Sequence, residues 1–241
     1  MEKNNSDKDV LYIIIPAYNE EENIKNVIND WCSVVEKTGE KSRLVIINDG
    51  STDKTKDIIC QMASQNEHIM PVTKNNAGHG AAVLYGYKFA IKEGADYIFQ
   101  TDSDGQTIPE DFPDFWKQRS SYDMIIGHRN KRQDGISRII VTKTLKLVLK
   151  LCFGVNITDA NTPFRLMKAD TLKKYVNLIP ENYNLSNVMI SVIYAKKKCS
   201  VKFIPITFKP RQGGKNSINI RKICKIGLQA LKDFKRLNKM I

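Results

Sequence analysis

The chain has 241 residues, a formal net charge of +12 at pH 7 and a sequence pI near 9.4. Its hydrophobic share of 41% is ordinary for a soluble protein, and the length suffices to bury a sizeable core. The positive surplus favours anionic partners: nucleic acid, phosphorylated small molecules or an acidic membrane surface. The five cysteines are scattered and form no CxxC pair, which argues against a disulfide framework or a zinc knuckle.

Membrane spans are not expected from the sequence. The longest apolar stretch, residues 139–153, is interrupted by Lys143, Lys146 and Lys150, whereas a span needs about 20 apolar residues. The first nine residues are polar and carry no signal-like segment. We therefore expect a cytoplasmic protein, with a peripheral position at the inner face of the membrane as the alternative.

The first half of the chain alternates short apolar runs with helical patterns. The apolar runs predict strands at 10–15, 44–47, 69–73, 98–101 and 124–126. Helices are predicted at 20–36, after a cap at Ser51 or Thr52 as far as residue 62, and at 81–93. This rhythm predicts an α/β fold with a mostly parallel central sheet and helices on both faces.

The pattern changes after residue 127. Residues 128–138 carry several basic side chains and predict a basic loop, and residues 139–153 predict an amphipathic basic helix. A late strand is expected at 201–207, and a basic amphipathic helix at the C-terminus follows the loop 213–217. We expect one catalytic domain over 1–241, with a nucleotide half at 10–127 and an acceptor-side half at 128–241.

The pentapeptide Asp102-Ser103-Asp104-Gly105-Gln106 directly follows a predicted buried strand. Carboxylates at the carboxyl end of a strand in an open α/β sheet lie where such sheets bind ligands. Two carboxylates and an amide oxygen suit Mg²⁺ or Mn²⁺, which prefer oxygen ligands and bridge phosphates. A plain Asp/Gly turn is the alternative interpretation of the pentapeptide alone.

Glycine-rich phosphate loops are absent from the expected places in the sequence. The turn after the first strand, residues 16–21, contains no glycine, so it is no GxGxxG turn, and no GxxxxGK[ST] run exists. Polar and acidic side chains instead follow successive predicted strands, at Tyr18 and Glu20, at Asp49, and at Asp102 and Asp104. A cluster of carboxylates that binds a phosphorylated ligand needs a cation between the carboxylates and the phosphate.

Five segments carry a family resemblance: IIIPAYNEEENI, INDGSTDKT, TDSDGQ, DANTPFRLM and RQGGKNS. With them the chain resembles family-two glycosyltransferases, inverting enzymes of the A-type fold that use nucleotide-sugar donors. It is most similar to the branch of dolichol-phosphate mannosyltransferases and polyprenyl-phosphate glycosyltransferases. The resemblance covers roughly residues 10–220, and the first two segments are the most specific.

The resemblance implies a role for each matching residue. Pro16, Tyr18 and Glu20 would line the nucleobase pocket, and Asp49 would hydrogen-bond the base. Asp102, Asp104 and Gln106 would hold Mg²⁺ or Mn²⁺, which stabilises the departing nucleoside diphosphate. Gly78 and Gly80 would permit close backbone approach to the nucleotide. The remaining implied donor-binding residues are Ser103, Arg211, Lys215 and Ser217.

Arginines supply the implied phosphate contacts, because their planar fork binds phosphate oxygens in pairs. Arg129 and Arg165 join Asp104 as the implied catalytic residues, while a solvated basic face remains the alternative for this cationic set. Arg165 lies in the apolar run Phe164–Met167 and needs a partner if it is buried. His79, within the turn Gly78–Gly80, is a weaker candidate for donor contact.

The acceptor is less well defined. An inverting transfer to a sugar hydroxyl needs a general base, and the expected acidic pair is missing from residues 181–189, where Glu181 is the only acid. A phosphate acceptor needs no base, so a polyprenyl phosphate such as dolichyl or undecaprenyl phosphate is favoured, although Glu181 or Asp159 could serve a hydroxyl acceptor.

Two further alternatives stay open at this point. One is a glycosyltransferase acting on a sugar hydroxyl in cell-surface polysaccharide assembly, and the other is a metal-dependent nucleotidyltransferase. Nucleic acid is not an expected partner, because the basic residues are dispersed and lack interleaved aromatic side chains.

Overall fold

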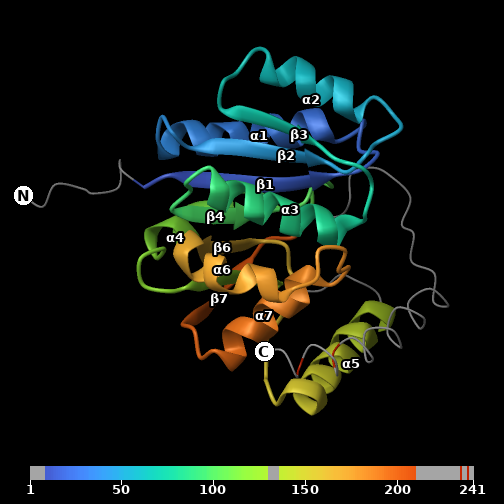
Figure 1. Cartoon of the computed structure of the whole chain (residues 1–241), viewed down its shortest axis with the longest axis vertical. Coiled ribbons are helices and arrows are strands. Elements are labelled where there is room, and N and C mark those ends of the chain that lie inside the picture. The colour runs from blue at the N-terminus through green and yellow to red at the C-terminus, as the bar shows by residue number, and fades with distance from the viewer. Residues whose placement is uncertain (1–8, 130–135, 210–233, 235–237, 239–241) are drawn as a thin grey trace, which may run out of the picture.

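The computed structural model of the chain describes residues 9–129, 136–209, 234 and 238, and its described part is built on one seven-stranded sheet (Figure 1). The strand order across the sheet is β3-β2-β1-β4-β6-β5-β7. The strands are β1 Leu11–Ala17, β2 Arg43–Asn48, β3 Ile69–Thr73, β4 Tyr97–Gln100, β5 Met124–Arg129, β6 Arg165–Lys168 and β7 Val201–Ile206.

One strand of this sheet runs against the others. The pairs β1–β2, β1–β4, β2–β3 and β5–β7 are parallel, whereas β6 is antiparallel to both β4 and β5. The predicted mostly parallel sheet is therefore confirmed. Strand β6 was not predicted, because a four-residue strand of sequence RLMK begins and ends on a basic residue and is too short to show a strand pattern.

Helices cover both faces of the sheet, as predicted. The side chains of β1 alternate between two buried clusters: Tyr12 and Ile14 belong to one, Leu11, Ile13 and Ile15 to the other. The first cluster packs against α3, α5, α6 and α7, and the second against α1, α2 and α4 (Figure 1). The helices are α1 Ile24–Thr38, α2 Thr55–Ala63, α3 His79–Lys92, α4 Phe112–Lys117, α5 Ile136–Phe153, α6 Ala169–Tyr175 and α7 Ser186–Lys196, with 3-10 turns η2 Pro109–Asp111 and η3 Val176–Leu178.

The second half of the chain departs most from the predictions. Strand β5 continues to Arg129 and α5 begins at Ile136, so both enter the range 128–138 that was predicted as a loop, and residues 130–135 of it lie outside the described residues. Helix α7, of sequence SNVMISVIYAK, was missed because its residues 186–194 are all buried, and a helix buried all round shows no polar face in the sequence. Strands β6 and β7 lie in the same sheet as the strands of the first half.

Helix α5 has an inner and an outer apolar side. Leu149 and Phe153 are buried, and the Phe153 ring contacts Phe234 with 5.3 Å between centroids. Leu147 and Leu151 are 57% and 76% exposed. Within the described residues, no helix is both long and apolar enough to cross a bilayer. Most of the predicted C-terminal helix lies outside the described residues.

Arg165 ties β6 to its surroundings from inside the core. Its side chain is 0% exposed, and its guanidinium donates to the carbonyl oxygens of Ala160, Thr162 and Asn187 and to Ser191 Oγ, at 2.6–3.3 Å. All three guanidinium nitrogens donate, so the guanidinium group joins the segment before β6 to helix α7. A buried charge with this many partners is costly to remove, because the carbonyl groups would lose their donor.

We therefore predict that Arg165→Met lowers the free energy of unfolding by about 3 kcal/mol, since several buried acceptors lose a charged donor. Urea unfolding followed by circular dichroism measures the change. The matched control is Lys173→Met on α6, an exposed position, which should leave the unfolding midpoint nearly unchanged. An Arg165→Met protein with an unchanged free energy of unfolding would show that the buried guanidinium group is not needed for stability.

Candidate functional site

A cavity of about 540 Å³ opens where β1, β2 and β4 end. Its lining includes eight residues that the sequence singled out: Pro16, Tyr18, Glu20, Asp49, Gly78, Asp102, Ser103 and Asp104. The other lining residues are Ala17, Asn76, His79 and Ala82. The carboxyl ends of parallel strands meet at one edge of a sheet, which is why segments 16–20, 49 and 102–104 come together. What these residues bind remains a prediction.

The first two sequence motifs hold each other in place beside this cavity. The backbone N–H groups of Asn19 and Glu20 donate to Ser51 Oγ at 3.1 Å and Thr55 Oγ1 at 2.8 Å. In return, the N–H of Thr52 donates to Asn19 Oδ1 at 2.8 Å. Ser51 or Thr52 was expected to cap α2, but α2 begins at Thr55 without a side-chain cap. The Ser51 hydroxyl fixes the turn after β1 instead.

Asp49 is an anion buried at the floor of the cavity, with 2% of its surface exposed. Its carboxylate accepts from Lys74 Nζ at 2.6 Å and from the backbone N–H groups of Ala77 at 3.1 Å and Gly78 at 2.9 Å. Three donors therefore already satisfy the carboxylate in the protein itself. Asp49 thus fixes the segment 74–78 against the end of β2, whichever further contact it makes with a base.

Gly78 and Gly80 were both predicted to allow close approach of the backbone to the nucleotide, but the structure requires glycine at the two positions for different reasons. Gly78 lines the cavity with φ +91°, a conformation that side chains strain to adopt. Gly80 does not line it: an added Cβ there would lie 2.2 Å from the Tyr183 carbonyl oxygen and 2.5 Å from that of Asn184. The expectation for Gly80 is therefore corrected, since its small size admits the 183–184 backbone and not a nucleotide. Ser186 Oγ reinforces this contact by donating to the Gly80 carbonyl at 2.9 Å.

Tyr18 and Glu20 form one wall of the cavity. The Tyr18 ring is 48% exposed, so a planar ligand can stack on it without displacing core side chains. Glu20 accepts from Asn23 Nδ2 at 2.9 Å, which orients its carboxylate at the start of α1. This wall offers an aromatic face and an acceptor group side by side.

Asp102 and Asp104 lie on the opposite segment, after β4. Asp102 Oδ1 is 3.0 Å from His79 Nε2, and Asp104 Oδ1 accepts from the Gln106 N–H at 3.2 Å. Gln106 does not line the cavity, and its amide nitrogen donates to the Lys209 carbonyl at 3.1 Å. The described residues contain no group of three or more His, Cys, Asp or Glu side chains arranged to hold a metal ion. Asp102 and Asp104 thus supply two carboxylates, so a metal ion at this point would need further oxygen atoms from a bound ligand to complete its coordination shell.

The predicted cationic residues are mostly outside the cavity or outside the described residues. The Arg165 guanidinium is buried and bonded to protein oxygens, so its expected phosphate contact does not fit and its observed role is to join β6 to α7. The backbone of Arg129 ends β5, but its side chain lies outside the described residues, as do Arg211, Lys215 and Ser217.

Three residues had little or no weight in the sequence analysis: Asn76 and His79, which line the cavity, and Lys74, which bonds Asp49. They follow β3 or begin α3, at the same edge as the other strand ends. The strand-end argument applied to β3 would have found Lys74 and Asn76. The contact between His79 and Asp102 joins segments 23 residues apart, and no local pattern announces it.

His79 titrates in an acidic environment. Desolvation by the pocket wall lowers the pKa of its imidazole, but the charge of Asp102, its hydrogen bond, and the charges of Asp104 and Asp49 outweigh this and raise the pKa above 6.5. The side chain is still 53% exposed. The protonated form therefore pairs with Asp102 at low pH, and the ion pair is lost as the pH rises through the raised pKa.

The comparisons with known proteins agree with this geometry. The chain matches the family model described as "Glycosyl transferase family 2" over residues 12–176. The chain therefore belongs to glycosyl transferase family 2, which confirms the family resemblance.

Three relatives with named functions are 25–28% identical to this chain over the matched residues. An undecaprenyl-phosphate 4-deoxy-4-formamido-L-arabinose transferase of Pectobacterium atrosepticum is 25% identical over 77% of this chain, which spans 60% of that relative's length. A UDP-N-acetylglucosamine–dolichyl-phosphate N-acetylglucosaminyltransferase of Methanococcus voltae is 28% identical over 82% of this chain and 84% of its own. An undecaprenyl-phosphate mannosyltransferase of Micrococcus luteus is 25% identical over 86% of each chain.

Among solved structures, the fold is shared with glucosyl-3-phosphoglycerate synthase from Mycobacterium tuberculosis in complex with Mn²⁺, uridine-diphosphate-glucose and phosphoglyceric acid. The TM-score is 0.70 at 15% identity, over 95% of this chain and 80% of that one. At this identity the likeness concerns the fold alone, and it confirms the predicted A-type α/β architecture.

We predict that the pKa of His79, measured by NMR titration of its ring protons, lies above 6.5 and falls in Asp102→Asn, because the neighbouring carboxylate stabilises the imidazolium. The matched control is Asp57→Asn on the exposed side of α2, which should leave the His79 pKa in place. An unchanged pKa in Asp102→Asn would contradict the pairing.

Proposed function

We propose that this protein transfers a sugar from a nucleoside-diphosphate sugar to a polyprenyl phosphate with inversion at the anomeric carbon. The observation that carries the proposal is the composition of the strand-end cavity. It combines an exposed aromatic ring with two carboxylates after β4, while the two candidate bases, Glu181 and Asp159, are not among its lining residues. Each of these features has a separate consequence for donor, metal and acceptor.

The donor proposal rests on the size and lining of the cavity. Its volume of about 540 Å³ lies within the range of small-molecule sites. The Tyr18 ring supplies a stacking face for a base, and the backbone at Gly78 permits close approach. Asp49 acts on the donor indirectly, because it holds the 74–78 segment in place. A lone pair of its carboxylate that these bonds leave unused can also accept a hydrogen bond from the base.

The metal proposal rests on Asp102 and Asp104, since a diphosphate cannot approach two carboxylates without a cation between them. Both line the cavity, and the Asp102 side chain is 28% exposed. Mg²⁺ or Mn²⁺ would bind there through carboxylate oxygens and would offset the charge of the leaving nucleoside diphosphate. Gln106 does not fit as a ligand in this structure, because it faces Lys209. His79 orients Asp102 through the contact of 3.0 Å between them.

The acceptor proposal rests on where the two candidate bases lie. Glu181 Oε1 accepts from Lys88 Nζ at 3.0 Å and lines a groove on the outer side of α3 with Lys88. Asp159 is 9% exposed and accepts from the Asn161 N–H at 3.3 Å. Neither lines the donor cavity. A phosphate acceptor is already anionic at neutral pH and attacks without a base, which favours a lipid phosphate over a sugar hydroxyl.

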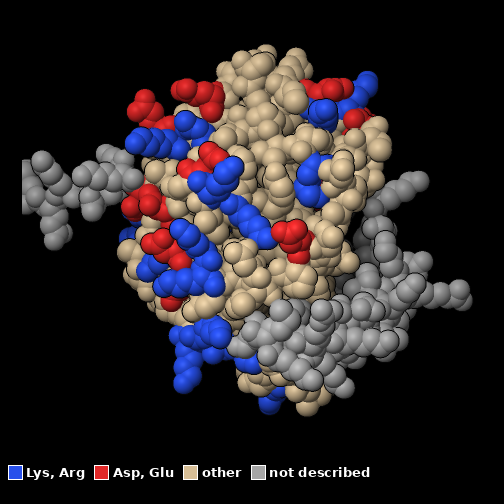
Figure 2. All heavy atoms as spheres, in the orientation of Figure 1, with Lys and Arg blue, Asp and Glu red and all other residues tan. Residues whose placement is uncertain are grey.

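A peripheral approach to the bilayer is supported by the outer side of α5. Leu147 and Leu151 are one turn apart and exposed, and Lys143, Lys146 and Lys150 beside them are exposed as well. Such a surface inserts apolar side chains while its lysines contact anionic lipid headgroups. On the face that carries α3, by contrast, basic and acidic side chains are interspersed (Figure 2).

We expect removal of divalent metal to stop transfer, and Mg²⁺ or Mn²⁺ to restore it. Asp104→Ala should lower turnover by about 100-fold or more, since metal stabilisation of a leaving group supplies several kcal/mol. Nucleoside-diphosphate release is the readout. The control, Asp114→Ala on the exposed side of α4, should keep full activity. Undiminished turnover in EDTA would sink the metal role.

The acceptor is tested with a panel of UDP-, GDP- and dTDP-sugars, each with polyprenyl phosphate and with the matching unphosphorylated polyprenol. Sugar transfer should require the phosphate, because only that group is anionic without a base. With the acceptor in anionic vesicles, Leu147→Ser/Leu151→Ser should transfer more slowly, while a short water-soluble acceptor phosphate should be used at the native rate. Thr144→Ala on the same helix is the control. Transfer to the polyprenol or to a soluble sugar hydroxyl at an equal rate would overturn the proposal.

A further inference from the structure

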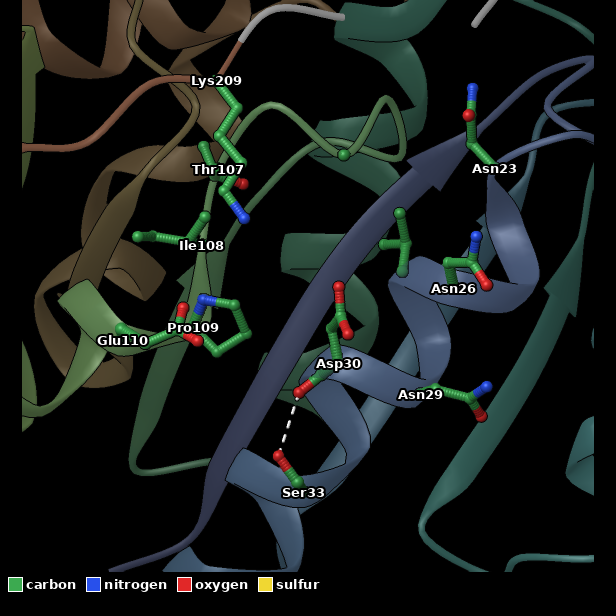
Figure 3. A pocket seen from close by; sticks show the side chains of 12 residues that line it. Asn23, Asn26, Asn29, Asp30, Ser33, Thr107, Ile108, Pro109, Glu110 and Lys209 are labelled. Atoms are coloured by element: carbon green, nitrogen blue, oxygen red, sulfur yellow. Dashed lines mark hydrogen bonds between the residues drawn. The ribbon is translucent and has the colours of Figure 1, made fainter. Parts of the chain in front are cut away.

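A second cavity, of about 290 Å³, lies beside the first half of α1. The labelled side chains of α1 form one wall, and residues 107–110 with Lys209 form the other (Figure 3). It shares no lining residue with the donor cavity. The two cavities are nevertheless neighbours in the chain, since Asp104 lines one and Gly105 lines the other.

The α1 wall has an unusual composition for a helix surface. Asn26, Asn29, Asp30 and Ser33 are all exposed and all line the cavity. A helix face that only needs to be soluble favours Lys, Glu or Gln, because Asn, Asp and Ser disfavour the helix. Short amide, carboxylate and hydroxyl groups hold their hydrogen-bonding atoms close to the backbone. This wall therefore presents fixed donors and acceptors where long flexible side chains would stabilise the helix better.

The charges in this cavity argue against an anionic ligand or a bare metal ion. Asp30 and Glu110 face one ammonium group, that of Lys209. Burial, the largest cause, and the charge of Glu110 raise the pKa of Asp30, while Lys209 lowers it. Two carboxylates beside one lysine repel a further anion. A phosphate would meet this repulsion, and within the described residues no group of three His, Cys, Asp or Glu side chains is arranged to hold a metal.

Mixed donors and acceptors fit a neutral ligand that has both. Amide groups donate and accept, carboxylates accept, and the Lys209 ammonium donates, which matches the hydroxyl groups of a sugar. Val27, Ile108 and Pro109 add a small apolar surface to the same cavity, suited to the C–H face of a sugar ring. The volume of about 290 Å³ accommodates one monosaccharide unit.

We propose that this cavity is a second carbohydrate site, which binds one neutral monosaccharide unit apart from the donor cavity. Two contacts connect it to the donor site. Asn23, which lines it, donates from Nδ2 to Glu20 Oε2 at 2.9 Å, and Glu20 lines the donor cavity. Lys209 and Gln106 exchange two hydrogen bonds, of 2.8 Å and 3.1 Å, at the end of the loop that carries Asp104. A bound sugar therefore contacts the framework of both walls of the donor cavity.

The test is a titration of the isotopically labelled full chain with glucose, mannose and N-acetylglucosamine, followed by amide NMR. No donor or lipid is present, so the result does not depend on the proposed transfer reaction. At least one sugar should shift the amide signals of Val27, Gly105 and Thr107 in a saturable way. Asn26→Ala and Asn29→Ala should each weaken binding about three- to tenfold, the effect of losing one net hydrogen bond.

The matched control is Lys25→Ala, an exposed residue of α1 outside the cavity, which should leave the affinity unchanged. Glucose 6-phosphate should bind more weakly than glucose, because Asp30 and Glu110 repel its phosphate. The proposal is overturned if none of the three sugars gives saturable shifts, if the shifts fall only on Ala17, Gly78 and Ser103 of the donor cavity, or if glycerol binds equally well.

Discussion

The buried carboxylate of Asp49 is the contact on which the shape of the donor cavity depends. It lies at the end of β2 with 2% of its surface exposed and accepts from Lys74 and from the N–H groups of Ala77 and Gly78. An anion at this depth is stable only with its donors in place. The segment between β3 and α3 is therefore held against β2, and the N-terminus of α3 is brought to the strand ends. His79, the first residue of α3, then meets Asp102.

Around this carboxylate, polar side chains hold the turns after the strands in place, and no glycine-rich turn follows β1. Ser51, Thr52 and Thr55 exchange hydrogen bonds with the turn at Asn19 and Glu20. The two motifs that looked like independent donor contacts in the sequence thus also form one rigid unit. Such a unit holds the wall formed by Tyr18 and Glu20 in place, and a preformed wall lowers the entropy that any ligand loses on binding.

The acceptor side depends on a different kind of contact, the close packing of backbone on backbone. Gly80 admits the carbonyl groups of Tyr183 and Asn184, and the Arg165 fork joins β6 to α7 by bonds to carbonyl oxygens. Together they place the 181–186 segment beside α3 and leave Glu181 on the outer surface with Lys88. The position of Glu181 outside the lining of the donor cavity is thus a consequence of packing.

The sequence by itself determined the features that depend on local pattern. Apolar runs and their spacing gave the strands and helices of the first half, and the positions of Asp49, Asp102 and Asp104 after predicted strands indicated one ligand-binding edge, because parallel strands must end together. The sheet with helices on both faces followed from the same alternation.

Tertiary structure decided what depends on contacts between distant segments. Strand β6 is too short and too basic to predict, yet it pairs antiparallel between β4 and β5, and its Arg165 bonds both the segment before β6 and helix α7. A sequence shows that Arg165 is charged but not whether its donors meet phosphate or carbonyl oxygen. The role of Gly80 and the pairing of His79 with Asp102 were likewise invisible, since a hydrogen bond or a van der Waals contact acts over a few ångströms and only folding brings those atoms that close.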